Sequence, residues 1–375
     1  MSEPRLTHAF ADALPEFAVE TTAASFPDRT LIVLNDDLSR ELGLDTDWLR
    51  TPEGLAWLTG AGGGHATAYV GHQFGQFAGL LGDGRALLLG DLAGYEIQVK
   101  GSGRTAFSRG MSDGKGALGP MLREYLVSEF MHAAGIPTTR ALAVVATGER
   151  LIRDGRPAQG AVVVRVASSH LRVGTVQLAA TQSEELVRRV VEFAGFATAS
   201  ELLDTVINRQ LNLVAQWMRI GFVHGVMNTD NVTLSGETID YGPCAFTEDF
   251  DPKAVFSSID TGGRYAFGNQ PDIMAWNLTK LAEALVPVLD IDEAQAMLAT
   301  MQQRWDELDT SRRDDLVFKP RNRMLGNAIK DAERGDLGPY FLLLGAVTDP
   351  YNPKAGPAWL AQPEDPEPFV TYCGT

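Results

Sequence analysis

The stretch that decides the fold is FVHGVMNTDNVTLSGETIDYGP, residues 222–243. Ser235-Gly236-Glu237 has the composition of a tight turn, so residues 232–234 and 238–239 are expected to be the two arms of a β-hairpin. Such a hairpin would place the residues at its open end side by side. The polar side chains of the stretch fall into a few recurring types, and they are His224, Asn228, Asp230, Asn231 and Asp240.

These polar residues have the chemistry of a metal-assisted transfer site. If the hairpin brings Asn231 beside Asp240, their amide and carboxylate oxygens would suit Mg²⁺ or Mn²⁺. Asp230, just outside that pair, is left to accept a proton. A base, an Asn and a metal-binding Asp are the parts used in kinase-like phosphoryl transfer. The alternative is an ordinary loop, because Asp and Asn are common in turns, where they bond their own backbone.

The composition is that of a globular protein with two lobes or two domains. The chain has 375 residues, 45% hydrophobic and 21% charged, so it can bury a sizeable core. Its formal net charge is −16, from 48 acidic and 32 basic residues. Nucleic-acid and anionic-membrane binders depend on basic patches, so neither kind of partner is expected. A nucleotide site is still compatible with this charge, because it needs only a few local cations.

Cysteine content and the N-terminus predict a cytoplasmic protein. Cys244 and Cys373 are too few for a disulfide scaffold. The first residues lack the apolar segment of a secretory signal, and no apolar run approaches the roughly 18–20 residues that span a bilayer. A transient bond between the two cysteines would tether the C-terminal tail beside Asp240; the alternative is that Cys244 is simply a small buried hydrophobe.

Upstream, a Gly-dense segment leads into a predicted hairpin. Gly82-Asp83-Gly84 precedes the apolar run 86–89, and residues 95–100 alternate as a half-buried strand does. Lys100 ends this strand and is followed by Gly101-Ser102-Gly103, where backbone N–H groups can approach a phosphate closely. The alternative is a plain flexible loop.

Two further charged positions stand out. Residues 121–134 have helical apolar spacing and end at Gly135, with Glu124 in the first turns, where it can pair with a strand-borne lysine as in kinases or belong to a solvated face. Arg165 interrupts the Val-rich strand 160–166, and Arg172 follows it. We expect Arg165 to face a cleft that holds an anion; the alternative is a carboxylate partner in the same lobe.

The order of predicted elements gives an α+β, protein-kinase-like fold. Residues 1–60 are expected to form an N-terminal arm packed on the core, in which Asn35 caps a helix running toward Leu49. Residues 61–175 would be a strand-rich N-lobe with the nucleotide-binding strands. Residues 176–345 would be a helical C-lobe with the catalytic loop and metal site, with helices over 182–220 and 272–335. Residues 346–375 would be an irregular tail.

The chain resembles the selenoprotein O family, bacterial pseudokinases that act as protein adenylyltransferases. The matching blocks follow one another over about two hundred residues, which makes the resemblance highly specific. They are GHQFGQFAGLLGDGRA (71–86), IQVKGSGRTAFSRG (97–110), REYLVSEFMHAAGIPTTRAL (123–142), VVRVASSHLRVG (163–174), GFVHGVMNTDNVTL (221–234), TIDYGP (238–243) and RYAFGNQP (264–271).

The resemblance implies a kinase-like fold that binds ATP in reversed orientation. AMP would then pass to Ser, Thr or Tyr hydroxyls of proteins with Mg²⁺ or Mn²⁺, and UTP with Mn²⁺ is a second option. Asp230 resembles the proton acceptor, and Asn231 and Asp240 the metal ligands. By position, the nucleotide contacts would be Gly82, Gly84, Arg85, Lys100, Asp113, Gly114, Arg165, Arg172 and Asp240, with Glu124 pairing with Lys100.

The sequence departs from the family pattern in places. Ala106 stands where a Pro is usual, the segments after Gly174 and at the C-terminus are short, and Ser257 lies near the position of a partner cysteine, which puts redox control in doubt. Two other functions compete: a conventional kinase that transfers the γ-phosphoryl group, and an inactive nucleotide-binding pseudokinase. Retention of Lys100 and Asp230 with both metal-ligand candidates disfavours the inactive form.

Overall fold

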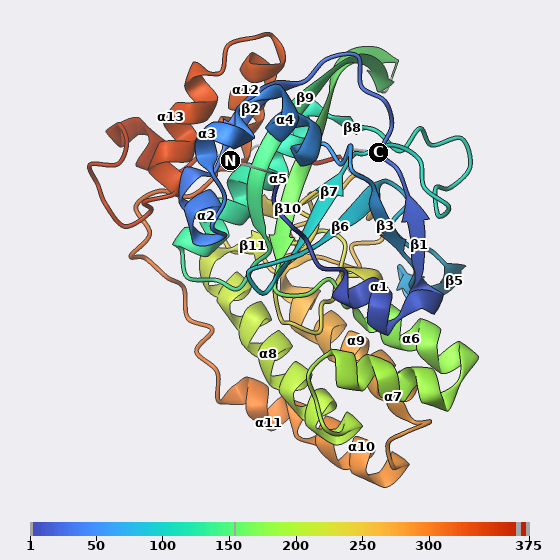
Figure 1. The fold of residues 1–375 in the computed structure, drawn as a ribbon. Helices are drawn as coiled ribbons and strands as arrows, with labels where there is room; N and C mark the ends of the chain where they lie inside the picture. Colours follow the sequence, from blue (N-terminus) through green and yellow to red (C-terminus); the bar gives the residue numbers. More distant parts are fainter. Residues whose placement is uncertain (1–2, 154, 365–368, 373–375) are drawn as a thin grey trace.

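The structure, a computed structural model, describes residues 3–153, 155–364 and 369–372. It is a mixed α/β protein built on a long antiparallel sheet, and the helices of residues 173–306 lie below the sheet in Figure 1. Across this sheet the order is β1 (Ala18–Thr21), β3 (Gly64–Thr67), β6 (Ala86–Leu92), β7 (Tyr95–Lys100), β10 (Arg156–Ala167), β9 (Arg140–Arg153) and β2 (Thr30–Leu34), with β8 (Gly116–Ala117) on β10. Two small antiparallel pairs are β4 (Val70–Gln73) with β5 (Gln76–Leu80), and β11 (Phe222–Val223) with β12 (Ala245–Phe246).

The predicted hairpin over 86–100 is confirmed as β6 and β7. Their register places Ala86 opposite Lys100 and Leu87 opposite Val99. Alternation then divides the side chains between two faces: Leu87 and Val99 join one apolar cluster, and Leu88 joins the other. A strand with apolar residues on both faces needs cover on both, and here helices supply it.

Residues 1–60 contribute more to the sheet than a packed arm would, because β1 and β2 both come from this segment. The helix expected to run from Asn35 to Leu49 is interrupted. Asn35 does cap α2 (Asp36–Glu41) by accepting the N–H of Leu38, but Gly43 turns into the left-handed region at φ 71°. The remainder forms α3 (Thr46–Leu49), capped by Asp45, and α4 (Pro52–Leu58) follows.

The helix predicted over 121–134 is α5 (Leu118–Ala133), which starts one turn earlier. Gly135, at φ 75°, ends it as expected. α5 packs on β9 and β10 and belongs to the same apolar cluster as the lower helices, so it joins the sheet to the rest of the molecule. Its buried side chains include Leu122, Leu126 and Phe130.

The helices expected over 182–220 are confirmed, and those expected over 272–335 are confirmed except for residues 307–321, which are not helical. Ser183 accepts the N–H of Leu186 to cap α7, and Gly221, at φ 72°, ends α8 directly before β11. A further helix, α6, precedes Ser183 and was not predicted. The helices of this part are α6 (Val173–Gln182), α7 (Glu184–Phe193), α8 (Ala199–Ile220), α9 (Gln270–Leu285), α10 (Ile291–Ala299), α11 (Met301–Asp306), α12 (Asn322–Glu333) and α13 (Gly338–Val347); α1 (Ala9–Ala13) lies near the N-terminus.

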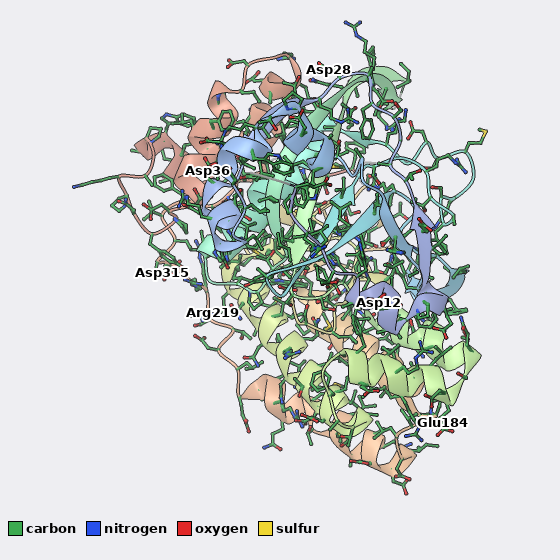
Figure 2. All side chains as sticks on the ribbon, viewed as in Figure 1. Asp12, Asp28, Asp36, Glu184, Arg219 and Asp315 are labelled. Atoms are coloured by element: carbon green, nitrogen blue, oxygen red, sulfur yellow. The ribbon has the colours of Figure 1, made fainter. Side chains whose placement is uncertain are left out.

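Charged side chains cover the outside of these elements. Asp12, Asp28, Glu184 and Asp315 are exposed and lie on widely separated parts of the chain (Figure 2). Among the residues that the structure describes, no helix combines the length and apolar character needed to cross a membrane.

Candidate active site

The polar loop, residues 224–231, follows β11 and ends in the short 3₁₀ turn η2 (Thr229–Asn231). His224 is buried in it, and its Nε2 lies 2.9 Å from the carbonyl oxygen of Ile239. Burial lowers the pKa of His224, so we assign the neutral ring with Nε2 as the donor. The bond fixes the loop to the residue that immediately precedes Asp240.

The hairpin expected between residues 232–234 and 238–239 does not form. Each arm pairs elsewhere: Thr233 forms an antiparallel bridge with Arg172, and Thr238 a parallel bridge with Thr138. Long-range partners satisfy the backbone groups that a hairpin would have used, including Leu234 N–H, which donates to Leu171. The turn itself exists, closed by Thr233 Oγ1 donating to the Glu237 carbonyl at 2.7 Å.

Lys100 and Glu124 form the predicted ion pair. Lys100 Nζ lies 2.6 Å from Glu124 Oε2, and both side chains are buried. Lys100 Nζ also contacts Asp240 Oδ1, so a single ammonium group joins two carboxylates. Burial raises the pKa of Glu124, but the charges of Arg165 and Lys100 outweigh it and lower the pKa overall.

Arg165 faces a carboxylate in the structure, which is the alternative weighed against an anion-holding cleft. Its Nε donates to Glu124 Oε1 at 3.0 Å and its Nη1 to Gln98 Oε1 at 2.9 Å. The guanidinium also lies 3.8 Å from Asp240 Oδ1. Arg165 therefore helps to hold Glu124 and adds positive charge beside Asp240.

Arg172, which lies outside the polar loop in sequence, packs against it. Its Nη1 donates to the backbone carbonyl of Asp230 at 3.0 Å, and its guanidinium stacks 4.4 Å from the Tyr69 ring centroid. Its Nη2 is 3.5 Å from Asp83 Oδ1, and Asp83 also accepts the hydroxyl of Thr67 at 2.6 Å. Asp83 was not predicted as a site residue; an acid between two glycines, shortly before a buried strand, was the available signal.

Asp230 is nearly buried, at 8% exposure, and lacks a strong hydrogen bond to its carboxylate. Oδ2 accepts from Gln73 Nε2 at 3.4 Å, and Oδ1 has no partner among the described residues. Burial raises the pKa of Asp230, only partly offset by its backbone hydrogen bond and by Arg172. Gln73, on β4, was missed from the sequence, although it lies in the Gly-rich block 71–86.

Asp240 has an unusual backbone. Its φ is 68°, a left-handed conformation that non-glycine residues seldom adopt. Burial raises the pKa of its carboxyl, but the charges of Lys100, Arg165 and Arg85 lower it overall, so the group is firmly ionised. Asn231 Nδ2 donates to the carbonyl of Val226 at 3.1 Å, and the amide oxygen is then left for other partners.

These two residues fit a divalent cation that takes part of its coordination from elsewhere. No cluster of three or more His, Cys, Asp or Glu side chains suited to a metal occurs in the described part of the chain. Mg²⁺ commonly uses one or two protein ligands and completes its shell with water and substrate phosphates. The ionised Asp240 carboxylate and the Asn231 amide oxygen are donors of the kind that such an ion takes from a protein.

The predicted glycines lie where loops pack closely. A Cβ on Gly82 would lie 2.4 Å from the Phe107 ring, and one on Gly114, which has φ 68°, would lie 2.2 Å from the Gly103 carbonyl oxygen. The carbonyl oxygen of Gly84 accepts a hydrogen bond from the Ser108 hydroxyl. The Gly82–Gly84 turn is thus tied to residues 103–108. Arg85 also binds this region, since its carbonyl accepts Gly101 N–H at 2.7 Å.

Asp113 lies at the edge of this arrangement. Its carboxylate accepts from Arg153 Nη2 at 2.8 Å and from the Lys115 N–H at 2.9 Å. Burial raises its pKa, but these hydrogen bonds outweigh that effect and lower it. The structure therefore shows Asp113 ordering the 112–115 turn.

The C-terminal tail reaches the segment after Asp240. Thr371 Oγ1 donates to the Pro243 carbonyl at 2.6 Å, and Thr371 bridges Ser257. Cys244 is buried, and burial raises the pKa of its thiol to about 12. Cys373 lies outside the described residues, so the hypothesis of a bond between the two cysteines stays a prediction.

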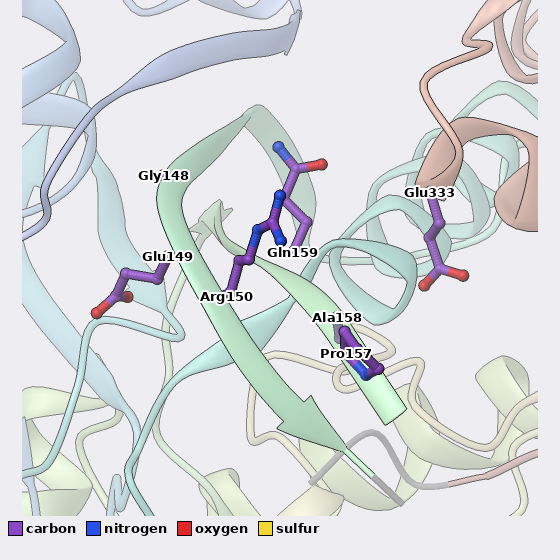
Figure 3. A pocket seen from close by; sticks show the side chains of 7 residues that line it. All are labelled: Gly148, Glu149, Arg150, Pro157, Ala158, Gln159 and Glu333. Carbon is purple, nitrogen blue, oxygen red and sulfur yellow. The ribbon is translucent and has the colours of Figure 1, made fainter. Parts of the chain in front are cut away.

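A separate cavity of about 380 Å³ contains none of the predicted site residues. It lies at the turn between β9 and β10, and Glu333 reaches toward it from α12 (Figure 3). Its lining is Gly148, Glu149, Arg150, Pro157, Ala158, Gln159 and Glu333.

Comparison with known proteins shows which family the chain resembles. Residues 2–312 match the family model described as protein adenylyltransferase SelO. A protein nucleotidyltransferase YdiU of Cereibacter sphaeroides is 42% identical, with 99% of each chain covered, and one of Mycobacterium sp. (strain KMS) is 43% identical, with 100% of each covered. One of Rhodopseudomonas palustris is 55% identical over 303 residues, 74% of this chain and 61% of that protein. The chain belongs to the SelO protein adenylyltransferase family and is a nucleotidyltransferase.

Proposed function

We propose that this protein transfers AMP from ATP to Ser, Thr or Tyr hydroxyls of other proteins. The observation that carries the proposal is that Lys100 contacts both Glu124 and Asp240, while Asp230 lies buried in the polar loop. This is the set of groups that kinase-like transfer needs. The names of the relatives add that the acceptor is a protein.

The proposed architecture is that of a kinase with two lobes. Residues 61–175 would form the N-lobe and 176–345 the C-lobe, with residues 1–60 packed on the core and 346–375 as a tail. The antiparallel sheet, the connecting helix α5 and the polar loop after α8 support this arrangement.

Asp230 is the proposed proton acceptor. A buried carboxylate with raised pKa and an unpartnered Oδ1 is a stronger base than an exposed one. It would take the proton of the acceptor hydroxyl while that oxygen attacks the α-phosphorus. The new P–O bond replaces the bond to the leaving pyrophosphate, and Asp230 later returns its proton to solvent.

The basic residues are proposed to hold the triphosphate. Lys100 and Arg165 lie together beside Asp240, and Arg172 donates to the backbone carbonyl of Asp230, so positive charge lies next to both aspartates. The reversed orientation of ATP would place the α-phosphate at Asp230 and the remaining phosphates toward the arginines. Gly82, Gly84, Arg85, Asp113 and Gly114 would contact the nucleotide along the adjoining loops.

Asp240 and Asn231 would hold Mg²⁺ or Mn²⁺. The ion would supply positive charge against the phosphates, which lowers the cost of charge developing on the leaving group. Lys100 would share the Asp240 carboxylate with the metal ion. Because Glu124 already balances the charge of Lys100, the lysine and the ion could lie at the same carboxylate.

One labelling experiment tests the proposal. The protein is incubated with an acceptor protein, Mg²⁺ or Mn²⁺, and ATP labelled first on the α- and then on the γ-phosphate. Protein-bound label from the α form alone is the expected result. Label from the γ form alone would indicate a conventional kinase, and label from neither would indicate a nucleotide-binding pseudokinase. A parallel reaction with α-labelled UTP and Mn²⁺ tests the second nucleotide.

A further inference from the structure

The surface beside Asp230 is a small β-hairpin with an open edge. β4 lies against the polar loop, and β5 lies at the rim of the molecule above α6 (Figure 1). Phe74, Phe77 and Leu80 of this hairpin are 37%, 54% and 60% exposed. β4 is the only strand paired with β5 in the described part of the chain. An open edge with apolar side chains is a site where another strand can add.

The backbone geometry shows which groups of β5 point outward. Phe74 and Gly75, at φ 52° and 81°, form a two-residue turn between the paired Gln73 and Gln76. In the next pair, His72 with Phe77, the N–H of His72 donates to Thr229 Oγ1 at 2.7 Å instead of to β5. The two residues are therefore a non-hydrogen-bonded pair, and the N–H and C=O of Phe77 point away from β4.

The hairpin is fixed to the residues expected to do the chemistry. Besides the His72 bond, Gln73 Nε2 reaches Asp230 Oδ2 and Phe74 N–H donates to Asn228 Oδ1 at 3.0 Å. The Phe77 ring packs 5.2 Å from that of His72, which in turn lies 5.4 Å from Trp276. A chain that added to β5 would thus be held on a rigid support next to Asp230.

The charges near the hairpin indicate the chemistry of such a chain. Arg109 donates to Gln73 Oε1 at 3.0 Å, and Arg264 lies 4.9 Å from the Trp276 ring and packs against Gly75. No ion pair with a carboxylate is found for either arginine among residues 3–153, 155–364 and 369–372. On a chain of net charge −16, this is a local site for an acidic group.

We propose that the outer edge of β5 binds an extended segment of the acceptor protein by strand addition. The segment would bond the backbone of Phe77, place apolar side chains on Phe77 and Leu80, and direct an acidic residue to Arg109 and Arg264. The inference rests on the proposed function, since it names how the acceptor of that same site is held. The preference of the enzyme for one acceptor over another would then depend on main-chain pairing with β5 and on apolar and acidic side chains in the paired segment.

Two substitutions at one position separate the backbone from the side chain. Phe77→Ala removes the ring and keeps the N–H, whereas Phe77→Pro removes both, and proline is tolerated where an edge N–H faces solvent. Dephosphorylated casein, an unfolded and acidic protein, serves as the acceptor for α-labelled ATP. We expect Phe77→Pro to raise the KM for casein about fivefold beyond Phe77→Ala, the value of one net hydrogen bond. The control Ile152→Ala changes a similarly exposed apolar residue on another hairpin.

Binding is measured separately from transfer, by the anisotropy of dye-labelled casein titrated with each variant. If Phe77→Pro weakens casein binding, the result supports strand addition at the β5 edge. This holds even if the wild type transfers no α-label, and in that case only the proposed function fails. Transfer with an unchanged casein KM in Phe77→Pro, at normal melting temperature, overturns the edge and leaves the function standing. Absence of both binding and transfer overturns both. A wild type that sediments as a dimer dissociated by Phe77→Pro would assign the edge to a second copy instead.

Discussion

Gly71 lies so close to Asp230 that a Cβ on the glycine would be 2.6 Å from Asp230 Oδ1. The contact joins β4 to the polar loop across more than 150 residues of sequence. Only a glycine leaves the carboxylate where it is, because any side chain would push it from its position. The closeness of the two residues makes the hairpin part of the site.

Gly71→Ala is therefore expected to lower kcat by about tenfold or more, since displacement of a catalytic group by an ångström has effects of this size and larger. Nucleotide binding should change little, because Asp230 is not proposed to hold the nucleotide. Gly262→Ala is the matched control, as nothing lies within 4 Å of the added carbon. Equal activity of the two variants would show that the Asp230 carboxylate can move without loss.

Asp230→Asn should lower kcat by roughly 10²–10⁴ while ATP still binds, the usual range for loss of a general base. Single-turnover transfer with bound nucleotide gives the rate, and a separate ATP titration gives the affinity. If the substitution instead abolishes ATP binding and leaves bound-state turnover intact, Asp230 is a ligand and not the base.

The same substitution should change the pH dependence of stability. The folded-state pKa of Asp230 is raised, so folding favours its protonated form, and the ionised form costs stability as pH rises through that pKa. Asp230→Asn should then raise the melting temperature at neutral pH, with the gain vanishing below the ordinary Asp pKa of about 4. Asp12→Asn, at an exposed site, is the control. A gain that is constant with pH would contradict the burial argument.

Glu124→Gln should destabilise the fold by about 3–5 kcal/mol, because it leaves Lys100 and Arg165 buried with less compensating charge. Urea unfolding measures the change. Glu184→Gln, which breaks an exposed ion pair with Arg188, should cost less than about 1 kcal/mol. Similar losses in both variants would mean that the Lys100 cluster is no more than a surface network.

Asp240→Ala and Asp240→Gly should both abolish transfer, since a carboxylate binds a hard cation far better than any replacement here. Their stabilities should differ. At φ 68° glycine carries no Cβ penalty, so Asp240→Gly should be about 1 kcal/mol more stable than Asp240→Ala. Full activity in either variant would remove Asp240 from the proposed metal site, and equal stability would show that the strain is relieved elsewhere.

Local sequence determined the elements that depend on neighbouring residues. The β6–β7 hairpin, the end of α5 at Gly135, the Ser183 cap and the Gly221 stop follow from alternation and capping, which act over a few residues. The pairing of Lys100 with Glu124 was also predictable, because each residue sat at a recognisable position on its own element.

Tertiary structure decided the contacts between distant segments. Residues 232–239 have the composition of a hairpin, yet Thr233 pairs with Arg172 and Thr238 with Thr138, because those distant segments offered backbone partners that composition cannot reveal. The sequence left open whether Arg165 faces an anion or a carboxylate of its own lobe, and the fold places Glu124 against its guanidinium. Asp230 is buried against β4, which the chain brings from far upstream, and its pKa is raised by burial, which depends on what surrounds the group in space.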